Sequence, residues 1–196
     1  MKTLGVTGTS GSGKSLFCAF LRGLGAAVID CDEVYHELLN SSVLLNSDIL
    51  ALFPEVEKNG FADRKALSRI VFADKMRLKQ LESTVFPHIT AEIWQTLEAL
   101  AREGTDIAVL DAPTLFESGA DALCDRIVAV CSPVEAQIER LHSREGLPRE
   151  DALKRINSRP PDTFYIEKGC EMVYNDDGIE KIRNKAERIC MSLRDE

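Results

Sequence analysis

A glycine-rich segment near the N-terminus constrains this chain more than any other feature. It reads Gly8-Thr9-Ser10-Gly11-Ser12-Gly13-Lys14-Ser15 and fits the pattern G-x-x-x-x-G-K-[ST] at every position. An apolar run precedes it and the helical pattern Leu16 to Leu21 follows it, which is the strand–loop–helix setting that the pattern requires. Glycines let consecutive N–H groups curl around a phosphate, and the following helix directs its positive dipole end to the same place. The segment is therefore expected to bind a phosphorylated ligand.

Within this loop the residue types indicate a nucleoside triphosphate with a metal ion. We expect all eight residues from 8 to 15 to bind ATP, with Lys14 reaching the β- and γ-phosphates. The Ser15 hydroxyl is of the kind that coordinates Mg²⁺. The alternative is a glycine-rich turn with a chance lysine, and it stands only if nucleotide fails to bind.

Five short apolar runs predict the fold class. Continuous rather than alternating apolarity is typical of strands buried on both faces, as in a parallel sheet. Helical patterns separate the runs, so we expect an α/β fold of the P-loop NTPase type, a five-stranded parallel sheet flanked by helices. The runs cover residues 4–7, 26–30, 107–111, 127–131 and 172–174.

Two long excursions interrupt this pattern within one domain of 196 residues. Residues 40–104 are far longer than one crossover helix needs, and we interpret them as an inserted helical subdomain. Residues 135–169 gather arginines and lysines in an otherwise acidic chain, which favours a mobile lid over anions. The core is then formed by residues of about 1–39, 105–134 and 170–196.

Acidic residues at the ends of two runs are candidates for chemistry. Asp30 and Asp32 close the second run, at the sheet edge where open α/β folds bind ligands. Asp32 is the candidate that accepts the proton of an attacking hydroxyl, and it is also a candidate helix N-cap, two roles that are compatible. The third run ends in Asp111, as a Walker B strand does, and Asp111 could hold Mg²⁺ through water.

Further candidates face the loop from later segments. His36, one helical turn after Asp32, is assigned to acceptor binding, as are Pro113, Leu115 and Glu117 beyond the third run. For Glu117 the start of a helix is an equal reading. Arg140 and Arg144 share a helix face, where they could meet the transferring phosphate and bound ATP or simply pair with acidic neighbours in solvent.

Composition excludes several classes of protein. The net charge of −8 argues against nucleic acid or an anionic membrane as partner. No apolar stretch approaches the roughly 20 residues that span a bilayer, and the N-terminus lacks a signal-type apolar region. The six cysteines form no Cys-x-x-Cys pair, so we expect reduced core thiols and a cytoplasmic protein. The sequence leaves the oligomeric state open.

The order of motifs resembles the dephospho-coenzyme A kinase family along nearly the whole chain. The similarity includes Val6 to Ser15, Val28 to Leu38, Ala112 to Gly119, and Gln137 to Leu147 running on to Ala152 through Ile156. The resemblance implies a P-loop kinase that uses MgATP to phosphorylate the ribose 3′-hydroxyl of dephospho-CoA, the last step of coenzyme A synthesis. It assigns Asp32 as the catalytic carboxylate, Lys14 as the phosphate lysine and Arg140 as the lid arginine. It also implies that the inserted helical subdomain binds the acceptor.

The chain departs from the usual family pattern in three places. Phe86-Pro87-His88 replaces His-Pro, Pro113-Thr114-Leu115 replaces Pro-Leu-Leu, and Asn175-Asp176 reverses an Asp-Asn pair. Two other functions stay open from the residues: a nucleoside or nucleotide monophosphate kinase, and a GTP-dependent switch. The switch depends on Asn184-Lys185-Ala186-Glu187, which is one residue short of the guanine motif Asn-Lys-x-Asp.

Overall fold

Five parallel strands form the central sheet of the computed structural model, which describes residues 1–176 and 178–195. The strand order is β2-β5-β1-β6-β7, and every neighbouring pair runs parallel. The predicted α/β fold is confirmed, because each apolar run has become one strand. The strands are β1 (Lys2–Gly8), β2 (Ala27–Asp30), β5 (Ile107–Asp111), β6 (Arg126–Cys131) and β7 (Glu171–Tyr174).

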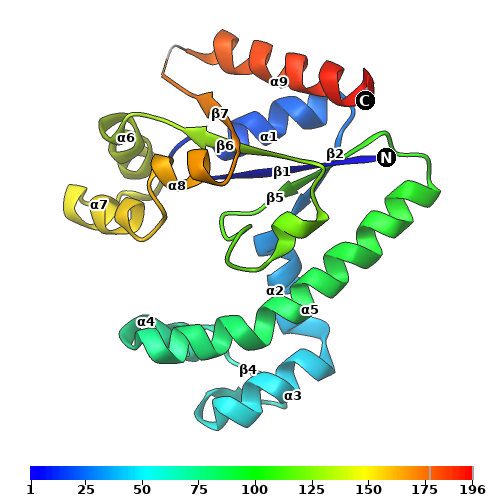
Figure 1. The fold of residues 1–196 in the computed structure, drawn as a ribbon. Helices are drawn as coiled ribbons and strands as arrows, with labels where there is room; N and C mark the ends of the chain where they lie inside the picture. The colour runs from blue at the N-terminus through cyan, green and yellow to red at the C-terminus, as the bar shows by residue number, and fades with distance from the viewer. Residues whose placement is uncertain (177, 196) are drawn as a thin grey trace.

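Two helices cover one face of the sheet, as Figure 1 shows. They are α1 (Lys14–Gly23) and α9 (Ile179–Asp195), which contact each other and the strands. Helix α9 is amphipathic: Ile182, Ala186, Ile189 and Leu193 are buried, whereas Ile179 is exposed. The shared core of this face contains Leu4, Val6, Phe17, Leu21, Ile107, Val109, Ile182 and Leu193.

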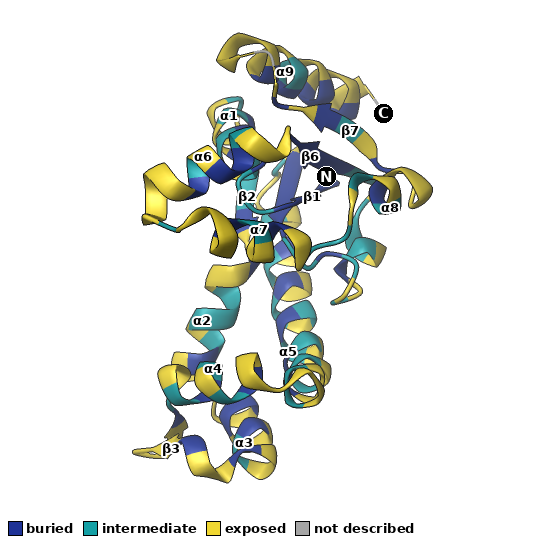
Figure 2. Cartoon of the chain, turned by 90° about the vertical axis from the view of Figure 1, so that its left-hand side faces the viewer, coloured by how far each residue is buried: buried dark blue, intermediate teal, exposed yellow. Residues whose placement is uncertain are grey.

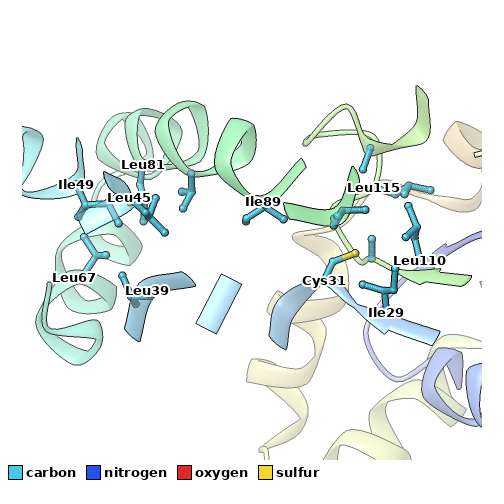
Figure 3. Close-up of a cluster of buried hydrophobic side chains, with 14 of the residues drawn as sticks. Ile29, Cys31, Leu39, Leu45, Ile49, Leu67, Leu81, Ile89, Leu110 and Leu115 are labelled. Carbon is cyan, nitrogen blue, oxygen red and sulfur yellow. The ribbon is translucent and has the colours of Figure 1, made fainter. Parts of the chain in front are cut away.

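The opposite face continues into the inserted segment without a break in its hydrophobic core. Figure 3 shows this cluster running from Ile29 and Leu110 at the sheet to Leu45 and Ile49 in the insertion. In Figure 2 two helices, α2 and α5, connect the sheet with the distal part of the insertion. The elements are α2 (Cys31–Ser41), α3 (Val43–Leu52), η1 (Pro54–Val56), α4 (Arg64–Ala73) and α5 (Lys75–Arg102).

A short hairpin lies in this otherwise helical insertion and was absent from the sequence-based expectation. Strands β3 (Glu57–Lys58) and β4 (Phe61–Ala62) pair antiparallel. Asn59 and Gly60 both have positive φ, 55° and 86°, which is the backbone of a type I′ turn. An Asn-Gly pair between two short strands was therefore the available signal.

The segment predicted as a lid contains three helices. Helix α6 (Val134–Glu145) packs against α7 (Arg149–Asn157) around a small core of its own, and α8 (Asp162–Glu167) leads to β7. Beyond β5, a turn and η2 (Ala120–Leu123) return the chain to β6. That these helices move as a lid, and that the insertion binds the acceptor, stay predictions.

Two expectations about the whole chain can be compared with the structure. All six cysteines are free thiols, five of them buried. Burial raises the pKa of Cys31 to about 12, so this thiol stays protonated near neutral pH. Across residues 1–176 and 178–195, no helix combines the length and apolarity that would carry it through a bilayer.

Candidate active site

The carboxyl ends of the central strands bring the candidate residues to one edge of the sheet. Strand β1 lies between β5 and β6, so the loop after β1 occupies the middle of this edge. In the sheet register Asp30 is paired with Asp111, and Asp111 with Val6. Residues that lie 80 or more positions apart in sequence are thereby placed at the same sheet edge as the glycine-rich loop.

The glycine-rich loop lines a cavity of about 660 Å³ at this edge. Helix α1 begins at Lys14, directly after Gly13, so the first turn of the helix opens on the cavity. All eight residues of the predicted loop take part in the lining. The other contributors are Leu16, Asp32, Pro113, Glu139, Arg140, Ser143, Arg144 and Arg155. Free N–H groups of the loop and the helix dipole make this hollow suited to anionic phosphate groups.

Lys14, which lines this cavity, forms a close ion pair with Asp111. The Lys14 Nζ lies 2.5 Å from Oδ1 of Asp111, and both side chains are largely buried. An incoming phosphate would compete with Asp111 for the Lys14 ammonium. In this conformation the Asp111 carboxylate is bound to Lys14. That Asp111 holds Mg²⁺ stays a prediction.

Asp32 borders the cavity that the glycine-rich loop lines, which we call the phosphate-side cavity. It also borders a second cavity beside it. The reading of Asp32 as the helix cap is wrong: Asp30 caps α2, and its Oδ1 accepts hydrogen bonds from Asp32 N (3.0 Å) and Glu33 N (3.1 Å). Asp30 and Asp32 do not share one extended segment, because α2 begins at Cys31 and Asp32 already lies in its first turn. The Asp32 carboxylate is thus left available for a ligand.

The electrostatic setting of Asp32 favours proton uptake. Although the side chain opens on the cavities, displacement of water by the surrounding protein raises the pKa of its carboxyl above the ordinary 3.8. The positive charge of Lys14 opposes this effect, and the negative charge of Asp30 adds to it. A carboxylate with a raised pKa is better matched to accept a proton than an ordinary surface aspartate.

The second cavity has a volume of about 290 Å³ and a largely apolar wall. It lies between α2, α4 and α5, with the end of β5 behind it. Apolar side chains from α4 and α5 in this lining include Leu67, Val71, Leu78, Leu81, Val85, Phe86 and Ile89. The polar or ionisable side chains of the lining are Asp32, Tyr35, His36, Arg64, Ser68, Glu82, Thr114 and Ser118. An apolar hollow with few polar groups is the usual form of a site for an organic ligand.

Comparison with known proteins decides the family. The family model described as dephospho-CoA kinase matches residues 2–181. A dephospho-CoA kinase of Symbiobacterium thermophilum is 39% identical over 95% of this chain and 79% of its own length. One from Fusobacterium nucleatum is 32% identical over 97% of both chains. This chain belongs to the dephospho-CoA kinase family.

Solved structures agree with this family and with the predicted fold. The Thermus thermophilus protein TT1252 has a TM-score of 0.81 and 31% identity, over 98% of this chain and 97% of its own. The dephospho-CoA kinase of Campylobacter jejuni has a TM-score of 0.71 and 27% identity, over 100% and 98%. A shikimate kinase from Bacteroides thetaiotaomicron, at 16% identity and a TM-score of 0.54, shares the P-loop kinase fold. Family membership also favours a phosphotransferase over the GTP-dependent switch.

The four residues predicted to bind the acceptor do not lie together in the structure. His36 lines the second cavity and Pro113 the first. The assignment of Leu115 to acceptor binding is corrected, because Leu115 is wholly buried in the core behind the site and cannot contact a ligand in this conformation. Glu117 lines neither cavity; it lies 3.8 Å from Nη1 of Arg159 and borders a separate surface hollow with Trp94.

The predicted lid arginines both reach the phosphate-side cavity, but their partners differ. Arg140 donates to backbone oxygens of the loop, including Gly11 O at 3.0 Å. Arg144 pairs with Glu145. Arg155 also lines the cavity and pairs with Glu145. It is one of the basic residues of segment 135–169, but no sequence pattern assigned it to the phosphate site. Its position seven residues after Pro148, on a second helix, gave no sequence signal that it would face the same hollow.

Proposed function

We propose that this chain transfers the γ-phosphoryl group of ATP to the 3′-hydroxyl of the dephospho-CoA ribose, giving CoA and ADP. The observation that carries the proposal is the shared position of Asp32. One cavity suits a triphosphate and the other an organic acceptor, and this one carboxylate borders both. A hydroxyl held at Asp32 is therefore next to the end of the triphosphate, where transfer requires it.

The roles of the residues follow from their places around the two cavities. Asp32 accepts the proton as the 3′-oxygen forms its bond to the γ-phosphorus, and the bond from that phosphorus to the bridging oxygen breaks to release ADP. Lys14 and the loop amides hold the β- and γ-phosphates. Three arginines line the phosphate-side cavity. Arg144 and Arg155 can neutralise phosphate charge there, whereas Arg140 donates hydrogen bonds to the loop backbone.

We propose that ATP is used with Mg²⁺, and the residues present fit that ion. Ser15 offers its hydroxyl at the cavity wall, and Asp111 is the nearby carboxylate that could act through water. Mg²⁺ usually takes one or two protein ligands and completes its shell with phosphate oxygens and water. When bound, the ion would neutralise charge on the transferring and leaving oxygens. We propose a cytoplasmic location, in keeping with six free thiols.

A direct assay tests the proposed reaction. The purified chain, incubated with ATP, Mg²⁺ and dephospho-CoA, should release ADP and add one phosphoryl group to dephospho-CoA, as mass analysis of the product would record. An acceptor that lacks the 3′-hydroxyl should not react. Phosphorylation of nucleosides or nucleoside monophosphates in place of dephospho-CoA would favour the other kinase function and overturn this one.

The pH dependence of the transfer should reflect Asp32. Because its pKa is raised, the carboxylate becomes protonated, and loses its function as a base, at a higher pH than an ordinary aspartate would. We expect kcat/KM for dephospho-CoA to fall on the acidic side with an apparent pKa above 3.8. Rates measured from about pH 4 to 8 at saturating ATP, beside ATP affinity over the same range, would check this. A flat profile would contradict it.

A further inference from the structure

The glycine-rich loop is held from outside by residues that begin more than 100 positions later in the chain. Gln137 accepts a hydrogen bond from Thr9 Oγ1 (3.1 Å), and its own Nε2 donates to Ser132 O (2.6 Å). Arg140 donates from Nη1 to Gly11 O (3.0 Å) and Ser12 O (3.3 Å). These contacts connect the loop to helix α6 and to the end of β6.

Asn175 is the buried centre of this support. It follows β7, and only 7% of its surface is exposed. Its Nδ2 donates to Ser12 O at 2.9 Å, and its backbone N–H donates to Cys131 O at 2.8 Å. Its backbone oxygen accepts from Ser132 Oγ (2.9 Å) and Arg140 Nη2 (3.2 Å). The backbone of Asn175 is thus held at both its N–H and its C=O, and its side chain extends from this fixed point to the loop.

The Asn175 contact acts on a peptide unit that faces the phosphate-side cavity. The peptide between Ser12 and Gly13 is planar and trans, so its C=O and N–H point in opposite directions. Holding Ser12 O toward Asn175 therefore turns the Gly13 N–H away from Asn175, on the side of the cavity that Gly13 lines. The amide dipole is oriented before any ligand arrives, which avoids the cost of ordering it on binding.

We propose that Asn175 is a positioning residue for ATP, which fixes the Ser12–Gly13 peptide so that the loop amides are aimed at the phosphates. This inference rests on the proposed function, since it assumes that the triphosphate occupies the loop. It gives a role to the Asn175-Asp176 order, in which this chain departs from the usual Asp-Asn pair. Asn175 does not contact substrate; its effect passes through the loop backbone.

Asn175→Ala tests the proposal by removing the shorter of the two hydrogen bonds to Ser12 O, which leaves this oxygen with only the longer one from Arg140 Nη1 (3.3 Å). We expect ATP affinity, measured by titration calorimetry, to weaken about tenfold, with KM for ATP rising in parallel and KM for dephospho-CoA unchanged. Hydrogen exchange of the peptide covering residues 8–15 should be faster in the nucleotide-free variant, while exchange in β1 and β5 is unchanged. Asn175→Ser keeps a small polar group that cannot reach Ser12 O, so it should show the same changes in ATP affinity and hydrogen exchange as Asn175→Ala.

Val173→Ala is the matched control, because Val173 is buried in β7, two residues before Asn175, but packs in the core rather than on the loop. It should lower the unfolding temperature without changing ATP affinity or exchange of the loop. Wild-type ATP affinity in both Asn175 variants, or loss of the fold in both, would overturn the positioning role. Failure of the wild-type chain to bind ATP or to phosphorylate dephospho-CoA would instead overturn the proposed function.

Discussion

Replacing Asp32 with asparagine should lower the turnover of dephospho-CoA by about 10² or more, which is the usual contribution of a general base. The asparagine amide has nearly the same size and can still accept a hydrogen bond, but it cannot take up the proton of the attacking hydroxyl. Because Asp32 is at the junction of the two cavities and does not hold the loop, ATP affinity should change little. Turnover at saturating substrates, with ATP binding measured by calorimetry, checks both expectations.

Asp30→Asn is the matched control for that variant. It makes the same chemical change two residues away, and asparagine is as good an N-cap as aspartate, so α2 should keep its start. We expect turnover close to that of the wild type. Equal losses in the two variants would show that the charge of the sheet edge matters rather than a base at Asp32, and unchanged turnover in Asp32→Asn would remove the proposed base altogether.

Replacing Gly13 with alanine should weaken ATP binding on the order of 100-fold. Gly13 has φ of 100°, a conformation that alanine adopts only with strain. A Cβ at this position would lie 2.0 Å from Nδ2 of Asn175, so the loop or the asparagine has to move. Strain of a few kcal/mol at the centre of the loop converts to roughly this loss, since each 1.4 kcal/mol is about tenfold. Calorimetric titration with ATP measures it.

Gly23→Ala provides the comparison, at the far end of the helix that follows the loop. Gly23 is the last residue of α1, and a Cβ there would meet nothing within 4 Å. Alanine is the better helix former, so the variant should bind ATP normally and be as stable as the wild type or slightly more stable. Normal ATP affinity in Gly13→Ala would show that the loop adapts to the extra methyl group, contrary to the conformation described here.

The local chemistry of the chain was open to prediction, since it depends on residues that are neighbours in sequence. The five apolar runs became the five strands, and the glycine-rich motif became the loop before α1. The Asn59-Gly60 pair could have predicted the hairpin as well. Errors arose where a helix boundary decides a role: with Asp32 as cap, α2 would start at Glu33, two residues later than its observed start at Cys31, where Asp30 is the cap.

By itself, the sequence determined that a phosphate-binding loop joins a buried strand to a helix in a parallel α/β fold, because backbone preference and apolar periodicity act over a few residues. Only the tertiary structure decided which side chains face the two cavities, that Leu115 is core, and that Arg140 and Asn175 hold the loop. The contacts of Arg140 and Asn175 with Ser12 join residues 128 and 163 positions apart. Their partners are backbone oxygens, which every residue possesses, so nothing in the residue pattern identifies them before the chain has folded.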